Sequence, residues 1–494
     1  MFLIGFLFVA SRAPVHFADA NLKVAVVAEL NRANHNVTDP TKSDMLLLTS
    51  LVTYGNEISD LTGIGYAKNL TKLYLHSNRL NSLPAEIGNL TKLTELHLDY
   101  NQLTSLPAEI GNLSKLTVLN LRHNPLTSLP AEIGNLTNLT SLDFNENRLT
   151  SLPAEIGNLT NLQKLDLFSN QLTSLPLELW KLTNLTELHL MNNPLTSLPA
   201  EIGNLTRLIL LNINSKQLTG LPAEIWNLTN LKSLSISGAP LNSLPAEIGN
   251  LTSLTSLSLN GTQLTSLPVE IGNLTNLTSL SFSDAQLKIL PAEIWNLTNL
   301  THLCLAKNQL TDIPVELGNL TNLIALHLRK NQLNNLPAEI GNLTKLRYMD
   351  ISYNYLKSVP SQIGNLTDLT GLNLSFNHLP SLPPEIGSLT NLTRLNLGHN
   401  PLTSPQAEIL NLTKLQYLSL NSNQLSNLPP AIGKLTNLKE LDLNSNQLTS
   451  LPAEIGKMKN LIRLNLLGNY LNEDNKKEVK RLLPKCNVCF SLYK

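Results

Sequence analysis

The chain has 494 residues, and its Lys+Arg 36 and Asp+Glu 36 leave a formal net charge of zero. This balance argues against the excess of cations that nucleic-acid phosphates or a polybasic membrane anchor require. Hydrophobic residues make up 42%, which excludes wholesale disorder, and three Cys are too few for a disulfide-built scaffold.

Residues 1–16 form a hydrophobic leader that has two interpretations. The run MFLIGFLFVA is typical of the apolar region of a signal peptide, although no Lys or Arg precedes it. An Ala-x-Ala site ends at Ala20, but cleavage there removes the start of the next segment, whereas cleavage near Ala10 or Ala13 leaves that segment intact. The alternative is a frayed part of an N-terminal cap. The run is too short to span a bilayer, so we expect no integral membrane segment.

Residues 17–47 are predicted to form a helical N-terminal cap. Asp19 or Asn21 is a suitable N-cap for an amphipathic helix whose apolar face contains Leu22, Val26 and Leu30. Thr41 and Asp44 have the spacing of a capping box, with Asp in place of the usual Glu or Gln. A cap is expected because the open end of a stack of repeats exposes its core.

Residues 48–469 repeat every 23 residues after one shorter unit of 22 residues. In the unit LTELHLDYNQLTSLPAEIGNLSK, which begins at Leu93, residues 96–98 alternate as in a short strand with one buried face. Pro107 cannot donate to a ladder, and the apolar spacing of residues 108–113 is typical of a helical or 3₁₀ turn. One such coil cannot bury its leucines alone, so stacked coils must share a continuous core.

Most units carry an asparagine after the strand, and its side chain is predicted to turn inward and bond backbone groups that leave the ladder. These structural asparagines are Asn78, Asn101, Asn124, Asn147, Asn170, Asn193, Asn308, Asn331, Asn354, Asn377, Asn400, Asn423, Asn446 and Asn469. Four consecutive units instead hold Lys216, Ala239, Thr262 and Ala285. Either these units are a neutral variant, with waters in place of the amide, or they form a softer middle.

Residues 470–494 are predicted to form a C-terminal cap. The segment 472–483 reads as an amphipathic helix with acidic residues in its first turn and basic residues toward its end, as the helix dipole favours. A closing strand follows, and it contains Cys486 and Cys489. A two-cysteine motif in a strand, without a second pair, is interpreted as cap packing and not as a metal or redox site.

The repeat pattern resembles that of the leucine-rich repeat family over nearly the whole chain. The LPxEIGxL version is similar to the repeats of Ras-suppressor and Roco proteins, and the order FxDxNL, TxxD, LTSL and ISDLTGI resembles the N-terminal cap of internalin-type bacterial proteins. The resemblance implies an α/β solenoid curved as a horseshoe, with a parallel β-sheet on its concave face. Short helical or 3₁₀ segments are then expected on its convex face.

Catalysis is not expected. The caps and repeats use up the chain, and it contains no GxxxxGK[ST], GxGxxG or HExxH motif. Of the ten His, eight are spread over many repeat units, and His76, His97 and His123 on successive coils occupy different columns of the repeat. We therefore predict a protein that is not an enzyme and has no cofactor and no metal site.

The concave face is the predicted site of function, because its variable positions gather aromatic and charged residues in an aromatic-poor chain. Such side chains anchor protein interfaces. The predicted partner-binding residues are Tyr74, His76, His97, Asp99, Tyr100, Arg122, His123, Phe168, His189, Met191, His327, Arg329, Lys330, Tyr348, Tyr353, Phe376 and His399. A monomer that binds a protein, and not nucleic acid, is expected.

Two functional classes stay open for such a binding module. The internalin-like cap and the leader imply a secreted or cell-envelope protein, such as a bacterial adhesion or host-interaction factor. The Ras-suppressor resemblance implies the alternative, a cytoplasmic scaffold in signal transduction. The fate of residues 1–16 separates these two classes.

Overall fold

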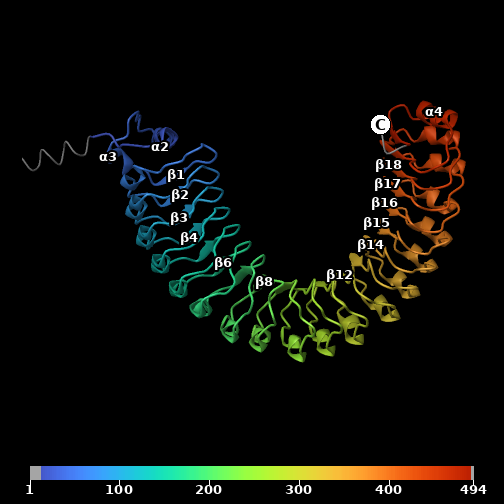
Figure 1. The fold of residues 1–494 in the computed structure, drawn as a ribbon, viewed down its shortest axis with the longest axis horizontal. Coiled ribbons are helices and arrows are strands. Elements are labelled where there is room, and N and C mark those ends of the chain that lie inside the picture. The colour runs from blue at the N-terminus through green and yellow to red at the C-terminus, as the bar shows by residue number, and fades with distance from the viewer. Residues whose placement is uncertain (1–12, 491–494) are drawn as a thin grey trace, which may run out of the picture. The chain divides into compact units, whose positions relative to one another are not determined.

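The computed structural model describes residues 13–490 and divides the chain into two compact units, with the boundary between Pro240 and Leu241. The apolar run of the predicted leader, at residues 1–10, lies outside the described residues. Within each unit every coil passes from a short strand to a 3₁₀ turn, and the strands line the inner side of the coils (Figure 1). The predicted solenoid, with a parallel sheet on one side and short 3₁₀ segments on the other, is confirmed.

The first unit begins with helices α2 (Ala20–Arg32) and α3 (Lys42–Met45). Its strands pair in parallel and in chain order, and they are β1 (Ser50–Val52), β2 (Lys72–Tyr74), β3 (Glu95–His97), β4 (Val118–Asn120), β5 (Ser141–Asp143), β6 (Lys164–Asp166), β7 (Glu187–Leu190), β8 (Leu210–Asn214) and β9 (Ser233–Ser237). The 3₁₀ turns are η1 (Ile64–Tyr66), η2 (Ala85–Asn89), η3 (Ala108–Asn112), η4 (Ala131–Asn135), η5 (Ala154–Asn158), η6 (Leu177–Lys181), η7 (Ala200–Asn204) and η8 (Ala223–Asn227).

The second unit has the same parallel order. Its strands are β10 (Ser256–Ser258), β11 (Ser279–Ser281), β12 (His302–Cys304), β13 (Ala325–His327), β14 (Tyr348–Asp350), β15 (Gly371–Asn373), β16 (Arg394–Asn396), β17 (Tyr417–Ser419), β18 (Glu440–Asp442), β19 (Arg463–Asn465) and β20 (Asn487–Cys489). Its 3₁₀ turns run from η9 (Ala246–Asn250) to η18 (Ala453–Lys457), one per coil, and helix α4 (Glu473–Leu482) precedes β20.

The core consists of aliphatic columns that repeat with the coils. In β3, Leu96 and the following Leu98 are fully buried, as is Ile110 of η3. Pro107 stands at the N-cap of η3 with φ −71°, so the ring that ends the ladder also starts the 3₁₀ turn. Each buried leucine contributes roughly 1.5–3 kcal/mol, and only neighbouring coils supply the surfaces that cover it.

The glycine of the LPxEIG segment is needed because neighbouring coils approach closely there. A Cβ at Gly111 would lie 2.6 Å from the carbonyl oxygen of Glu132 on the next coil. Three units place a tryptophan at this position instead, namely Trp180, Trp226 and Trp295, and all three are at least 97% buried. The sequence analysis did not single out these residues, although they are the only Trp in the chain.

The structural asparagines turn inward as predicted, and each ties its own coil to the preceding one. Asn101 is 7% exposed, and its Oδ1 accepts a hydrogen bond from the Leu80 amide at 3.0 Å. Its Nδ2 donates to the carbonyl of Leu98 on its own coil at 3.0 Å and to that of Leu75 on the preceding coil at 2.9 Å. One amide thus satisfies three buried backbone groups that have left the ladder.

Where the column is interrupted in the first unit, the strands themselves become longer. Strands β8 and β9 each have five residues, and the ladder continues through the pairs Ile213↔Ile236 and Asn214↔Ser237. Backbone groups therefore stay in the ladder for longer where no Asn side chain receives them. Lys216 is exposed, as expected, and the neighbouring Ser215 hydroxyl donates to the Leu195 carbonyl at 2.6 Å.

In the second unit, the Thr262 hydroxyl donates to the Leu259 carbonyl at 3.0 Å, and Ala285 is buried without a polar side chain. The short first coil of the chain also differs from the others. Asn56 occupies the asparagine position in the sequence, but it is exposed and bonds only the Thr53 side chain among the described residues. The column therefore starts at Asn78.

The N-terminal cap has the predicted contacts. Asp19 is the N-cap of α2, and its second oxygen accepts from the Ser59 amide at 2.7 Å. Thr41 and Asp44 form the predicted capping box at α3. The cap also includes residues from the segment expected to be leader, because Pro14 pairs with Thr41 and the Val15 amide donates to the Pro40 carbonyl at 2.7 Å.

At the other end, α4 begins at the N-cap Asn472, and β20 pairs in parallel with β19. Cys486 and Cys489 are half-buried, and burial raises the pKa of Cys486 to about 11. A thiol with a raised pKa is a poor nucleophile and a poor metal ligand at pH 7. This agrees with a role in cap packing.

The asparagine column generates a testable prediction. Asn124 is 3% exposed and bonds the Leu103 amide and the Leu98 and Leu121 carbonyls, so Asn124→Ala should lower the free energy of unfolding by about 3 kcal/mol, because buried backbone groups lose their partners. Lys216→Ala, in the same column but exposed, should cost less than about 0.5 kcal/mol. Urea unfolding followed by circular dichroism measures both, and equal losses would contradict this role.

Candidate binding face

The outward side of each sheet, here called the strand face, follows from the strand alternation. In the coil of Asn101, Leu96 points into the core, whereas Glu95, His97, Asp99 and Tyr100 are half-buried or exposed. Every residue of the predicted partner-binding set is likewise half-buried or exposed. These side chains are thus available on the surface without disturbing the core.

The residue before the structural asparagine has a left-handed backbone in most coils. Tyr100 and His123 have φ 56°, and Tyr353, Phe376 and His399 have φ 58°, 55° and 56°. Coils elsewhere place small or flexible residues here, such as Ser77, Gly261 and Ser422. This conformation costs a bulky L-residue roughly 1–2 kcal/mol, so an aromatic residue at this position is not explained by backbone preference.

In the first unit, the strand face carries ring pairs between successive coils. Tyr74 and His97 meet edge to face with centroids 4.4 Å apart, and Tyr100 and His123 lie 4.7 Å apart. His76 stacks on Tyr54 at 5.1 Å, a residue that the sequence analysis did not select. These contacts order the rings in neighbouring coils.

The charges of this first-unit face are internally paired. Lys72 lies 3.0 Å from Glu95, Lys164 lies 3.3 Å from Glu187, and Arg122 lies 3.5 Å from Glu146. A hydrogen bond from the Tyr74 hydroxyl and then one from Lys72 lower the pKa of the Glu95 carboxyl. These cations therefore have acidic partners within the protein.

In the second unit, three rings stack continuously across three coils. Tyr353 and Phe376 have centroids 3.9 Å apart with planes at 12°, and Phe376 and His399 have centroids 3.7 Å apart with planes at 13°. Arg329 and Lys330 lie over the free face of this stack, 4.9 Å and 5.3 Å from the Tyr353 centroid. The stack is therefore capped by two cations at one end.

A groove of about 310 Å³ lies between this stack and a second aromatic row, Tyr355 and His378. Asn331, Asn354 and Asn377 also line it. Their amides already bond backbone groups, as in Asn354, whose Oδ1 accepts from the Leu333 amide and whose Nδ2 donates to the Leu328 and Ile351 carbonyls. This groove, with the stack and its two cations, is called the aromatic slot below.

Another ring contact lies beside the slot. Tyr348 is tilted against His327 with centroids 5.1 Å apart. The Tyr348 ring lies over Gly371 of the next strand, where a Cβ would come within 2.8 Å of the ring. Glycine here makes room for the ring on the strand face.

The structure brings together most of the predicted residues in two groups, one in each unit. Phe168, Asp99, His189 and Met191 lie on the first-unit strand face but have no ring partner among the described residues. Sequence reasoning missed Tyr355 and His378. Both occupy the position after the structural asparagine, 23 residues apart, and this shared column is the signal that could have identified them.

The energies of the second-unit stack show that the fold does not require it. Two stacked ring pairs contribute about 0.5–1.5 kcal/mol each. Three left-handed aromatic residues cost roughly 1–2 kcal/mol each. The summed backbone cost is at least as large as the summed gain from stacking, so the aromatic choice is not explained by stability alone.

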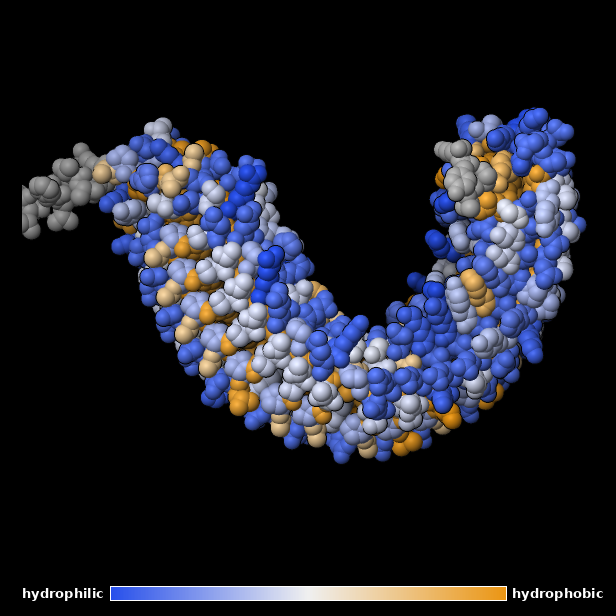
Figure 2. Space-filling view, viewed as in Figure 1, coloured by the Kyte–Doolittle hydropathy of each residue, from blue (hydrophilic) through white to orange (hydrophobic). Residues whose placement is uncertain are grey.

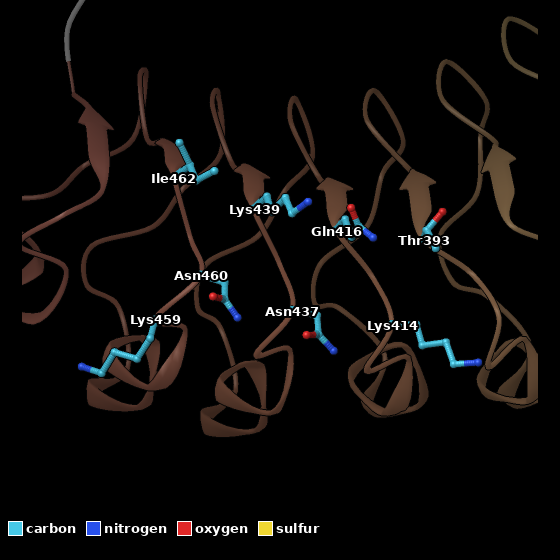
Figure 3. A pocket seen from close by; sticks show the side chains of 8 residues that line it. All are labelled: Thr393, Lys414, Gln416, Asn437, Lys439, Lys459, Asn460 and Ile462. Atoms are coloured by element: carbon cyan, nitrogen blue, oxygen red, sulfur yellow. The ribbon is translucent and has the colours of Figure 1, made fainter.

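A second hollow lies away from the strand face, between neighbouring coils of the second unit. It has a volume of about 720 Å³ and is lined by Thr393, Lys414, Gln416, Asn437, Lys439, Lys459, Asn460 and Ile462 (Figure 3). Lys414 and Lys459 lie near the 3₁₀ turns, whereas Lys439 and Ile462 lie near the strands. The Asn437 and Asn460 amides donate to the Thr413 and Thr436 carbonyls of the preceding coils, so they have a structural role. The hollow has no aromatic lining.

The surface outside these sites is mainly polar on the face in view. Figure 2 shows this face of both units as largely hydrophilic, broken by hydrophobic residues that recur from coil to coil. Within residues 13–490, no three His, Cys, Asp or Glu side chains gather in a way that could hold a metal ion. The same part of the chain has no helix long and apolar enough to cross a membrane.

Comparisons with known proteins agree with this geometry. A family model described as a leucine-rich repeat region matches residues 50–192, 177–260, 256–337 and 403–473, and a second, described as leucine rich repeat, matches 321–379, 345–402 and 367–425. A search of curated proteins gives no match.

Among solved structures, the chain is similar to a leucine-rich repeat protein of Leptospira interrogans, with 36% identity, 91% of this chain and 97% of that chain covered, and a TM-score of 0.54. It is also similar to a TDR receptor, with 28% identity, 91% and 86% coverage and a TM-score of 0.72. The functional domain of InlJ from Listeria monocytogenes, at 23% identity, 91% and 79% coverage and a TM-score of 0.55, shares the fold.

The half-buried histidines His97 and His327 generate a prediction about pH. Burial lowers the pKa of His97 and of His327 below the usual 6.5. The unfolded chain therefore binds more protons than the folded chain below pH 6.5, and stability should fall as the pH drops through that value. The double variant His97→Asn with His327→Asn should lose less in Tm between pH 7.5 and pH 5.5 than the unmodified protein.

Asparagine is a matched choice for this test, because Asn120 holds the position of His97 in the next coil and Asn373 holds that of His327 two coils further along the chain. Differential scanning calorimetry at both pH values measures the difference. The same drop in Tm for both proteins would show that these histidines do not carry the pH dependence.

Proposed function

Because the chain belongs to the leucine-rich repeat family, whose domains are typically protein–protein interaction modules, we propose that it is a non-enzymatic binding protein. The strand faces engage a partner protein, and the partner-binding residues are the aromatic, histidine and basic side chains predicted for the concave face. The protein acts as a monomer, without a cofactor and without nucleic acid.

The three-ring stack of Tyr353, Phe376 and His399 is the observation that carries this proposal. It places aromatic side chains at positions where the backbone disfavours them and where other coils use serine or glycine. Residues held at such a cost without a gain in stability are expected where they contact a ligand. Aromatic and arginine side chains are also those that contribute most to protein interfaces.

Export to the cell envelope or the medium is the favoured location. It is supported by the apolar leader and by the internalin-like order of motifs in the cap. The cap contacts of Pro14 and Val15 favour cleavage before Pro14. Cleavage after Ala20 would remove Asp19, which caps α2 and binds Ser59.

The alternative is an intracellular scaffold, which the LPxEIGxL repeat of the Ras-suppressor and Roco type supports. Both proposals use the same strand faces and differ in the partner's location. An adhesion or host-interaction role follows from the first, and a role in signal transduction follows from the second.

A variant pair tests the binding face. Tyr100→Ser with Phe376→Ser should weaken capture of the partner by at least about tenfold, because both anchors are lost. Serine is already present in this column at Ser77 and Ser422, so the fold should persist. The control variant is Lys414→Asn with Lys459→Thr. Both positions are exposed and lie away from the strand face, and other coils have Asn or Thr at the corresponding positions of the repeat.

The measurement is quantitative affinity capture from host and bacterial extracts, with bound proteins identified by mass spectrometry. Loss of a partner with the strand-face variant and its retention with the control supports the proposal. Equal capture by both variants would refute the choice of anchors.

The intact mass of the mature protein tests the location. Export predicts a species in the culture medium or envelope that starts between residues 11 and 14. A cytosolic species that begins at Met1 would contradict export and favour the scaffold. Mass spectrometry of separated medium, envelope and cytosol distinguishes these outcomes.

A further inference from the structure

We infer that the aromatic slot of the second unit binds an acidic segment of the partner, with one apolar side chain inserted between the two aromatic rows. This inference rests on the proposed function and specifies the chemistry of its partner. It is carried by three features of the slot, namely its apolar walls, its uncompensated positive charge and its length.

The walls of the slot accept an apolar group and disfavour a sugar. The ring faces of Tyr353, Phe376 and His399 are turned toward one another in the stack, so mainly ring edges face the groove. Binding of a carbohydrate by stacking needs a free ring face. The floor amides of Asn354 and Asn377 are already hydrogen-bonded to backbone, so the floor offers a ligand few polar partners.

The charge around the slot favours an acidic partner. Arg329 and Lys330 lie over the Tyr353 ring, and neither has an acidic partner among the described residues. The nearby carboxylate of Asp350 is 6% exposed and accepts a hydrogen bond from the Ser352 hydroxyl at 2.6 Å. The two cations are exposed and therefore available to a carboxylate from outside.

The aromatic pair of the first unit differs in this respect. There, Arg122 lies over Tyr100 but pairs with Glu146, which also contacts His123. The positive charge beside Tyr100 is thus compensated within the protein. The aromatic slot and the ring pair at Tyr100 therefore have different preferences, and of these two the slot is the one expected to select acidic segments.

The length of the slot sets the spacing of the ligand groups. Lys330 and Phe376 occupy the same column two coils apart, which is about 10 Å at the usual strand spacing. An extended peptide advances roughly 3.3 Å per residue, so about three residues separate the carboxylate from the apolar anchor. The preferred segment therefore has Asp or Glu about three positions from Phe, Leu or Met.

Defined peptides test this inference on the full chain. The probes are fluorescein-labelled, capped nonapeptides with Phe and Glu three positions apart in a Gly/Ser background, one with Lys in place of Glu, and one with Ser in place of Phe. Fluorescence anisotropy should show binding of the first and at least about tenfold weaker binding of the other two, with an affinity that falls as salt rises. Equal binding of the acidic and basic peptides, or no binding of the acidic peptide, overturns the inference.

Variants then locate the binding. Phe376→Ser should weaken binding of the acidic peptide at least about fivefold, and Arg329→Ser with Lys330→Ser should weaken it at least about tenfold and flatten its salt dependence. Both cations are exposed, and Ala306, Ser352 and Ser422 occupy their columns in other coils, so this second variant should fold. Tyr100→Ser and Lys439→Thr are the matched controls, and a loss as large in either of them would place the binding elsewhere.

Failure of this inference can be told apart from failure of the proposed function. If the strand-face variant Tyr100→Ser with Phe376→Ser loses a partner from extracts but the acidic peptides do not bind, the binding function stands and the slot chemistry is wrong. If no strand-face variant changes the capture of a partner or the binding of a peptide, the proposed function and this inference are both wrong.

Discussion

The buried asparagine at the end of the strand is the interaction on which the rest of the structure depends. A strand of three residues satisfies few of its own backbone groups, and the chain must then turn away through the core. In Asn101 and its equivalents, one amide bonds three such groups and joins two coils. In a coil that carries the asparagine, an insertion would move the amide out of reach of the preceding coil, so this interaction opposes a change of period there.

A fixed register separates the constrained positions from the free ones. Leucines and asparagines hold the coils together, so residues such as His97 or Tyr353 vary without cost to the core. The turn before the asparagine imposes a left-handed backbone, which glycine adopts more easily than Phe376 does. The second unit places three rings at this position nonetheless, beside two cations that have no acidic partner within residues 13–490, and this is why we propose the binding function there.

Much of this architecture could be predicted from the sequence, because it depends on periodic patterns. The strand, the 3₁₀ turn, the asparagine column and the capping by Asp19 and by Thr41 with Asp44 are local or repeat with a fixed period. The stacking of Tyr353 on Phe376 depends on ring orientation, which spacing does not specify. The longer strands β8 and β9 lie in coils without the asparagine, whereas β10 and β11, which also lack it, keep three residues. The repeat pattern does not specify this difference, and it is visible only when the coils are placed together.

Native-state hydrogen exchange is the most direct test of the asparagine column. The amides of Leu103, Leu310 and Leu333 donate to an asparagine Oδ1, whereas in the described part of the chain no side-chain oxygen accepts from the amides of Leu195, Leu218, Leu241 and Leu264. The account predicts that the first group exchanges at least about tenfold more slowly than the second. The reason is that each amide of the first group donates a buried hydrogen bond to an asparagine side chain, and the amides of the second group lack this bond. Equal protection of the two groups would contradict the claim that these side chains hold the coils in register.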